Sequence, residues 1–302
     1  MAVHPRALEL TESILPHMIP NESELTAGVV IEPGKSYGFF TDTTTCIGFK
    51  ACEVACKEWN ALPADDIGLT GNSYDNTGAL GATTWRHVAF IEQIRPDGGE
   101  RVTAMAPYQS NWLMMSDVCK HCKDAPCLQA CPTGAIFRSE FDTVVVQHDV
   151  CNGCGYCVPA CPFGVVELDK IDGKAHKCTL CYDRLKGGLE PACAKSCPTE
   201  AIQFGEIEDL HARARRRVEA LHGQGRPEAY LYGVPESPGA TGGIQQLNAF
   251  FLLVDKPEVY NLPAAPTLPS RRVRPGLLAG LATMAGLALA AVAAFAGDKG
   301  DG

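Results

Sequence analysis

The cysteines constrain this chain more than any other feature of its sequence. There are 15 of them in 302 residues, an odd number that cannot all pair as disulfides within one chain. They form four groups: Cys46, Cys52 and Cys56; Cys119, Cys122, Cys127 and Cys131; Cys151, Cys154, Cys157 and Cys161; and Cys178, Cys181, Cys193 and Cys197. No cysteine lies outside these groups, and proline follows the last cysteine of the second, third and fourth. Such clustering indicates metal binding or thiol chemistry in a reducing compartment.

The N-terminus and the charge balance narrow the class of protein. The first 20 residues contain neither a basic segment followed by an apolar run nor a twin-arginine pair, so we expect no export signal on this chain. Without export, disulfides lose their usual oxidising context. The net charge of -9 and the pI near 5.4 exclude a general nucleic-acid binder, which would carry a basic surface. An apolar fraction of 46% predicts a folded protein.

The third cysteine group has the spacing of a bacterial ferredoxin, C-x2-C-x2-C-x3-C-P. Three thiolates on a tight loop can reach three corners of one iron–sulfur cube, while the fourth cysteine ligates the other cluster of a pair. Zinc is the main alternative, but zinc ribbons usually carry two C-x2-C pairs rather than a triplet with an outlying Cys-Pro. The spacing of the third group, and the similar spacing of the second, therefore predict iron–sulfur clusters.

Crossed ligation of this kind assigns every cysteine to a cluster. The second and third groups lie in tandem and form one two-cluster unit, so the first and fourth groups pair with each other by elimination. The expected ligand sets are Cys119, Cys122, Cys127 and Cys161; Cys151, Cys154, Cys157 and Cys131; Cys178, Cys181, Cys193 and Cys56; and Cys46, Cys52 and Cys197. We expect the inner pair of clusters to lie in the middle of the row, with the outer pair at its ends.

These pairings predict an α+β fold in which one bacterial two-cluster ferredoxin-like unit is nested inside another, followed by a C-terminal transmembrane helix. Similar segments after three of the groups, ACPTGAI, ACPFGVV and SCPTEAI, each join a Cys-Pro turn to a short apolar strand. The expected divisions are an N-terminal arm at 1–40, the first motif with a hairpin insertion at 41–118, the inner unit at 119–172, the fourth motif at 173–205, a helix with a partner-contacting extension at 206–274, and the transmembrane helix at 275–297.

Three segments outside the motifs have clear secondary-structure patterns. Residues 142–147 are expected to form a hairpin strand that covers the inner unit, and residues 84–94 and 101–108 predict a hairpin in the insertion. An amphipathic helix is predicted by apolar residues at helical spacing: Ile207, Leu210, Ala214, Val218 and Leu221. Its arginines, Arg213 and Arg215 to Arg217, are expected to lie largely outside, solvated or in contact with phospholipid or a partner.

The segment at 275–297 contains no charged side chain. About 20 residues at 1.5 Å each suffice to cross a hydrocarbon core of roughly 30 Å, so one transmembrane helix fits here. The alternative is an Ala-rich helix buried in a soluble core. Arg271, Arg272 and Arg274 precede the segment and Lys299 follows it. The positive-inside rule therefore favours the cytoplasmic face of the cell membrane for the cluster-bearing part.

The motif segments resemble a known family. CIGFKACEVACKEWN, VCKHCKDAPCLQACPTGAI, CNGCGYCVPACPFGVV and HKCTLCYDRLKGGLEPACAKSCPTEAI are similar to the iron–sulfur subunit of membrane-bound formate dehydrogenases, and more broadly to the four-cluster subunits of molybdopterin oxidoreductases. The resemblance covers residues 40–262 and extends to the C-terminal helix. It implies electron transfer through four clusters, from a catalytic subunit carrying molybdenum or tungsten to a membrane cytochrome or quinone-reactive subunit. Such dehydrogenases place this domain outside the cytoplasm, exported with a partner.

One position departs from the family pattern. Phe49 stands where the family has the second cysteine of the first group, and the chain holds no spare cysteine to replace it. In related subunits an aromatic residue at the equivalent second position of a cluster motif goes with a three-iron cluster, so the resemblance implies three 4Fe-4S clusters and one 3Fe-4S cluster at the Phe49 position. The alternatives are an empty site, a cubane with a water or another non-cysteine ligand, and a sequence error.

Nothing in the sequence suggests a catalytic site. Nucleotide-binding, zinc-protease and hydrolase patterns are absent, so we expect a non-catalytic subunit that contacts a catalytic subunit, a membrane subunit and the bilayer, and no nucleic acid. The alternatives are the same electron wire in a polysulfide, nitrate or dimethylsulfoxide reductase, a complete soluble enzyme, and a structural zinc protein. We expect His121 to form hydrogen bonds or pack rather than bind metal. Six lysines near ligands are candidates for raising cluster potentials, with solvated lysines as the alternative: Lys50, Lys57, Lys120, Lys123, Lys174 and Lys177.

Overall fold

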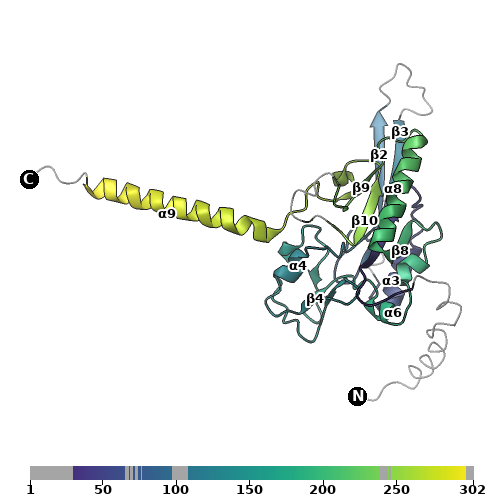
Figure 1. Cartoon of the computed structure of the whole chain (residues 1–302), viewed down its shortest axis with the longest axis horizontal. Helices are drawn as coiled ribbons and strands as arrows, with labels where there is room; N and C mark the ends of the chain where they lie inside the picture. The colour runs from purple at the N-terminus through teal and green to yellow at the C-terminus, as the bar shows by residue number, and fades with distance from the viewer. Residues whose placement is uncertain are drawn as a thin grey trace, which may run out of the picture.

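The computed structural model describes residues 30–64, 68, 71, 74, 75, 77–96, 108–237, 244 and 246–296. Short helices and strands form a globular part, from which one long helix near the C-terminus projects (Figure 1). The globular part is thus a mixture of helices and strands, as the α+β prediction requires.

A four-stranded sheet lies at the centre of the globular part. Its strand order is β8 (Ile202–Glu206), β1 (Tyr37–Asp42), β10 (Ala249–Leu253) and β9 (Tyr230–Tyr232). β1 runs parallel to β10 and antiparallel to β8, and every residue of β1 and β10 is buried. Burial on both faces explains why β10 is a continuous apolar run without alternation, and why the residues of β1 up to Phe40 carry no charge. Residues 37–40 of the expected N-terminal arm, and the β9 and β10 segments of the expected extension, therefore belong to the core.

The helix α8 (Ile207–Gly223) packs against β1, β8 and β9. Four of the five apolar residues that predict it are buried, and Val218 is half-buried, so the predicted amphipathic helix is confirmed. Arg213 and Arg215 are exposed, whereas Arg217 reaches back to the sheet and pairs with the buried carboxylate of Asp42 at 2.8 Å. The polar face of α8 is thus solvated except at Arg217, which ties the helix to β1.

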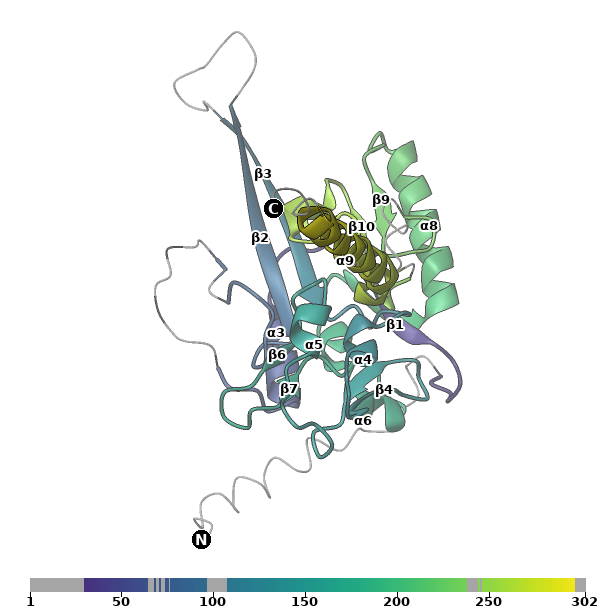
Figure 2. The same ribbon diagram turned by 90° about the vertical axis from the view of Figure 1, so that its left-hand side faces the viewer.

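A long hairpin extends from the globular part, as Figure 2 shows. Its strands are β2 (Arg86–Pro96) and β3 (Tyr108–Val118), paired antiparallel from Arg86 opposite Val118 to Pro96 opposite Tyr108. The first strand lies where the sequence predicts it. The second follows the expected segment rather than filling it, and residues 101–107 lie outside the described residues. Because β3 ends immediately before Cys119, the base of the hairpin lies at the cysteine motifs.

The cysteine motifs themselves fold into short elements. Two small hairpins pair β4 (Ile136–Arg138) with β5 (Val144–Val146), and β6 (Glu167–Leu168) with β7 (Ala175–His176). β5 confirms the strand expected within residues 142–147. The short helices are α3 (Ala51–Trp59), α4 (Pro126–Gln129), α5 (Cys157–Ala160), α6 (Tyr182–Lys186) and α7 (Ala192–Lys195). Helix α3 packs on α7, and α4 packs on α5.

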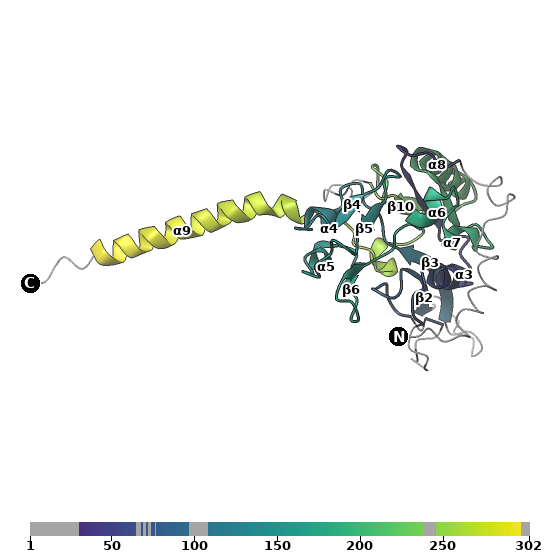
Figure 3. The same cartoon turned by 90° about the horizontal axis from the view of Figure 1, so that it is seen from below.

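The chain continues through two 3-10 turns, η2 (Pro257–Tyr260) and η3 (Pro269–Arg272), into the helix α9 (Val273–Ala296). The stretch Pro269–Ala294 has a mean hydropathy of 2.1, and none of its most apolar window is buried, so burial in a soluble core is wrong for this helix. By length and composition it can cross a membrane. Figures 1 and 3 both show α9 leaving the globular part beside α4, and the Ser270 hydroxyl donates to Gln129 of α4 at 3.0 Å.

Candidate iron–sulfur sites

All 15 cysteines lie in the described residues, and all are free thiols. Within the described part of the chain, no three His, Cys, Asp or Glu side chains converge on a point where they would hold a single metal ion. A tetrahedral zinc site requires such convergence, because each Zn–S bond is only about 2.3 Å long. An iron–sulfur cube is larger than one ion and needs thiols spread around it.

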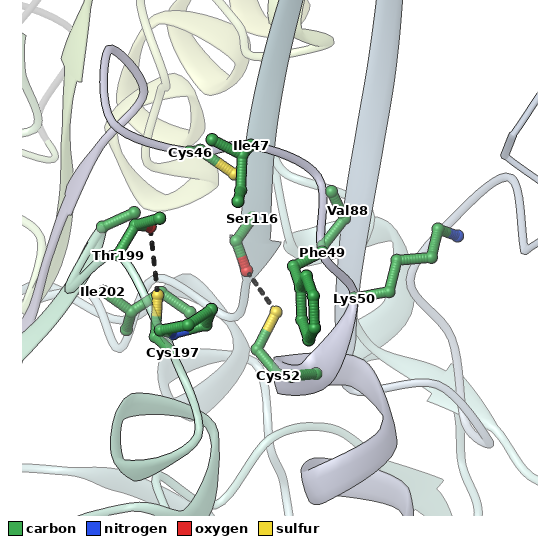
Figure 4. Close-up of a pocket in the computed structure, with 13 residues that line it drawn as sticks. Cys46, Ile47, Phe49, Lys50, Cys52, Val88, Ser116, Cys197, Thr199 and Ile202 are labelled. Carbon is green, nitrogen blue, oxygen red and sulfur yellow. Dashed lines mark hydrogen bonds between the residues drawn. The ribbon is translucent and has the colours of Figure 1, made fainter.

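The first candidate, the Phe49 site, consists of Cys46, Cys52 and Cys197 together with Phe49. These four residues line one cavity. Figure 4 shows the three sulfurs around this space, with the Phe49 ring beside Cys52. Phe49 is 68% exposed, so it borders the cavity at the surface rather than filling it.

Backbone geometry shapes the loop that carries this site. Gly48 has φ +68°, and a Cβ there would lie 2.6 Å from the Phe90 ring, so only glycine fits against the hairpin. Lys50 is also left-handed, with φ 61°, and immediately precedes α3. These two turns bring Cys46 back over the start of α3, where Cys52 lies in the first turn and Cys56 in the second.

The structure brings the other twelve cysteines together in three further groups. In the Cys56 site, Cys56 interacts electrostatically with Cys178, Cys193 and Cys181. In the Cys119 site, Cys122 interacts with Cys119, Cys127 and Cys161. In the Cys151 site, Cys157 interacts with Cys131, Cys151 and Cys154. The four groups have the same members as the ligand sets that crossed ligation predicts.

Neighbouring thiols, both within a group and between adjacent groups, oppose one another's ionisation. Burial, followed by the nearby thiolates of Cys119 and Cys193, raises the pKa of Cys178 to about 12. Burial also raises the pKa of Cys157 to about 11, with contributions from the thiolates around it. Metal ligation requires thiolates, so binding must displace these protons and supply compensating positive charge. A group of four such thiols is a suitable donor set for iron.

Hydrogen bonds to sulfur further fit the sites to clusters. The backbone N–H groups of Leu180 and Ala175 donate to Cys178 at 3.2 Å and to Cys151 at 3.5 Å. The hydroxyls of Thr133 and Thr199 lie 3.6 Å and 3.8 Å from the sulfurs of the Cys-Pro cysteines two residues earlier. Such bonds stabilise thiolate ligands and tune cluster potentials.

The four sites form a row. Cys52 of the Phe49 site interacts with Cys193 of the Cys56 site, and Cys178 of the Cys56 site interacts with Cys119. The Cys119 and Cys151 sites share the packed helices α4 and α5. The order is therefore the Phe49, Cys56, Cys119 and Cys151 sites. The expectation that the inner pair, the Cys119 and Cys151 sites, lies in the middle of the row is wrong. The Phe49 and Cys56 sites are neighbours, and the Cys151 site lies at one end.

Buried cations accompany the row. Of the six lysines considered from the sequence, Lys120 and Lys177 are buried: Lys120 pairs with Asp117, and Lys177 donates to the carbonyl oxygens of Val144 and Cys178. The remaining four lysines form ion pairs or hydrogen bonds with other side chains, or are only partly buried. Lys50 pairs with Glu53, Lys57 donates to Thr84, Lys123 pairs with Asp142, and Lys174 is half-buried.

Two further side chains stand out near the sites. Arg86 is 1% exposed and donates to the sulfur of Cys193 at 3.2 Å. Burial lowers its pKa, but the thiolates of Cys193 and Cys52 outweigh burial and raise it above its usual value. Arg86 was not among the residues predicted from the sequence; its signal is a charged residue shortly before the apolar run at 88–91 of a predicted strand. His121 is fully buried and accepts from the backbone N–H of Val144 at 3.0 Å, which bears out the expected hydrogen-bonding role.

Comparison with known proteins identifies the family. A family model described as a 4Fe-4S dicluster domain matches residues 110–207, which hold the second, third and fourth cysteine groups. The chain is 40% identical over 255 residues to the nitrate-inducible formate dehydrogenase iron-sulfur subunit of Escherichia coli K12, covering 82% of this chain and 81% of that protein. This protein belongs to the family of formate dehydrogenase iron–sulfur subunits. It is also 40% identical over 261 residues to the formate dehydrogenase iron-sulfur subunit of Haemophilus influenzae, covering 84% and 78%.

The family likeness extends to a second kind of subunit. The B subunit of the anaerobic dimethyl sulfoxide reductase of Escherichia coli K12 is 35% identical over 179 residues, covering 59% of this chain and 77% of that protein. The resemblance stated from the motif segments is therefore confirmed. The relatives are iron–sulfur electron-transfer subunits, and the chain is a non-catalytic member of this group.

Proposed function

We propose that this chain relays electrons through four iron–sulfur clusters between a formate dehydrogenase catalytic subunit and a membrane subunit that passes them to quinone. The observation that carries the proposal is the continuous row of four thiol groups. Bound clusters supply one-electron redox chemistry, and this chain supplies the thiolates and the hydrogen bonds that hold them. The proposed ligands are the four predicted sets, which make two nested ferredoxin-like units.

The cluster composition follows from the donor count. Three sites present four thiols each, which suits three 4Fe-4S clusters. The Phe49 site presents three thiols, and an aromatic ring stands where a fourth ligand would bind. We therefore assign it a 3Fe-4S cluster, which lacks the iron at that corner.

The position of α9 supports a direction along the row. The helix leaves the globular part beside α4, whose Cys127 belongs to the Cys119 site. The α3 and α7 helices, which carry cysteines of the Phe49 and Cys56 sites, lie on the side away from α9 in Figure 3. If α9 anchors the chain in the membrane, the Cys151 end of the row is close to the bilayer and the Phe49 end is distant from it.

Exposed side chains at both ends suit protein contacts. Ile47, Phe49 and Val54 are each more than half exposed around the Phe49 site. At the other end, Cys154 is exposed and Tyr156 is 63% exposed. Apolar groups gathered in this way mark interaction surfaces. We assign the Phe49 end to the catalytic subunit and the Cys151 end to the membrane subunit.

The relay is tested in the complex purified with both partner subunits. Substituting Cys157→Ala removes one thiol from the Cys151 site, so formate should still reduce a dye at the catalytic subunit while quinone reduction falls more than tenfold. Val158→Ala, on the same short helix α5, is the matched control and should leave both rates unchanged. Quinone reduction by the Cys157→Ala complex at the control rate would contradict the relay.

A related function is favoured by the likeness to the dimethyl sulfoxide reductase subunit. The same row of clusters would then carry electrons in the opposite direction, to a reductase. Adding formate to the anaerobic complex distinguishes the two, because only a formate dehydrogenase partner reduces the clusters with formate. The isolated chain should oxidise no formate in either case.

A further inference from the structure

We propose that Arg86, acting with Ser116, raises the reduction potentials of the clusters in the Phe49 site and the Cys56 site together. The inference rests on the proposed function, since it takes both sites to hold clusters. It concerns two residues of the hairpin insertion, which supplies no cysteine.

Arg86 lies between the two sites. It is the first residue of β2 and pairs across the hairpin with Val118, the last residue of β3. Its guanidinium divides its contacts: Nη2 donates to the Cys193 sulfur at 3.2 Å, and Nη1 lies 3.3 Å from both the hydroxyl and the carbonyl oxygen of Ser116. One side chain therefore contacts Cys193, a proposed ligand of the Cys56 site, and Ser116, which in turn contacts the Phe49 site.

Ser116 completes the link. Its Oγ lies 3.2 Å from the Cys52 sulfur, and Figure 4 shows this contact beside the cavity. Because Oγ accepts a hydrogen bond from Arg86, its own hydrogen is available to Cys52. The result is a hydrogen-bonded chain from the Cys193 sulfur through Arg86 and Ser116 to the Cys52 sulfur, which joins one ligand of each site.

In the part of the chain that the structure describes, the charge of Arg86 has no acidic partner. Among the described residues no carboxylate forms an ion pair with it, and its one aromatic neighbour is the Phe39 ring, 4.7 Å from the guanidinium carbon. Lys120, by contrast, is paired with Asp117. A buried cation without compensation is costly, and two anionic clusters would provide that compensation. We therefore take the clusters to be the missing counter-charges.

This placement predicts the direction of the effect. A cluster gains one negative charge on reduction, so a nearby positive charge and hydrogen bonds to its ligand sulfurs favour the reduced form and raise the potential. Arg86 supplies charge to both sites and a direct hydrogen bond to one. Ser116 supplies only the hydrogen bond to Cys52. Loss of Arg86 should therefore affect two clusters, and loss of the Ser116 hydroxyl should affect one.

The test is an EPR-monitored redox titration of the purified complex with Arg86→Gln, Ser116→Ala and the surface control Arg213→Gln on α8. In Arg86→Gln the reduction potentials of two of the four clusters should fall. The fall should be at least tenfold in the equilibrium constant for reduction, which is about 59 mV for a one-electron couple. Ser116→Ala should lower the reduction potential of one of these two clusters and leave the potentials of the other three unchanged. Arg213→Gln should change none.

Two results would overturn the inference: unchanged potentials in an Arg86→Gln complex with full iron content, or an equal fall in all four clusters. If the Arg86→Gln complex loses iron, the Ser116→Ala complex becomes the test, because this variant keeps the charge of Arg86 and the packing of the hairpin. Unchanged potentials in the Ser116→Ala complex would also overturn the inference. A wild-type complex without four reducible clusters would instead refute the proposed function, so the two failures are distinguishable.

Discussion

Restoring the missing cysteine is the most direct perturbation of the Phe49 site. Phe49→Cys places a fourth thiol beside the cavity that Cys46, Cys52 and Cys197 line. The structural cost is small: the ring is 68% exposed, and full burial of a phenylalanine contributes about 1.5–3 kcal/mol, so losing the remaining third costs about 0.5–1 kcal/mol. The fold should tolerate this change, and any change in the cluster then reports on ligation.

We expect Phe49→Cys to convert the proposed 3Fe-4S cluster to 4Fe-4S. Iron should rise from about 15 to about 16 atoms per chain, and the EPR signal of a three-iron cluster in the oxidised protein should disappear. Phe49→Ala is the matched control, because it removes the ring without adding a ligand and should keep the three-iron signal. A persistent signal in Phe49→Cys would refute the placement of residue 49 at the missing corner. About 16 irons and no oxidised signal in the wild type would refute the three-iron cluster itself.

Three further predictions address stability and the membrane. Asp142→Asn should lower the free energy of unfolding by about 1–3 kcal/mol at pH 7, because the carboxylate accepts from Ser36 and Arg138. These bonds hold the pKa of Asp142 below its usual value against the effect of burial, so its contribution is present above that usual value and is lost as pH falls through the lowered pKa; urea unfolding at several pH values measures this, and a difference that persists in acid would contradict it. Leu210→Ala, at a fully buried position in α8, should cost about 2–5 kcal/mol in the same assay, whereas Arg213→Ala should change stability by less than about 0.5 kcal/mol. Deleting residues 273–302 should release the chain, expressed without partners, from liposomes in a flotation assay with its iron content unchanged; continued flotation would show that α9 is not the anchor.

Local patterns in the sequence were enough to predict the ligands. The ferredoxin spacing follows from the reach of thiolates on a tight loop, and three of the Cys-Pro turns lead into β4, β6 and β8 shortly afterwards. Helical periodicity predicted α8, and the uncharged segment predicted α9. Each of these features depends on residues close together in the chain, so their spacing carries the information.

Contacts between distant segments were decided only by the tertiary structure. β1 pairs in parallel with β10, although some 200 residues separate them, and no local pattern marks that partner. The order of the four sites depends on how α3 packs on α7 and α4 on α5. Arg86 reached Cys193 only because the hairpin folds back onto the motifs.

The sequence by itself therefore predicted how many clusters this protein holds, which thiols are available to each and where one ligand is missing. The tertiary structure decided which clusters are neighbours, which end of the row lies beside α9 and which buried cation lies between two sites. The physical reason is that ligand spacing is a property of short loops. Proximity between sites arises instead from long-range packing, which many residues determine together and no single motif encodes.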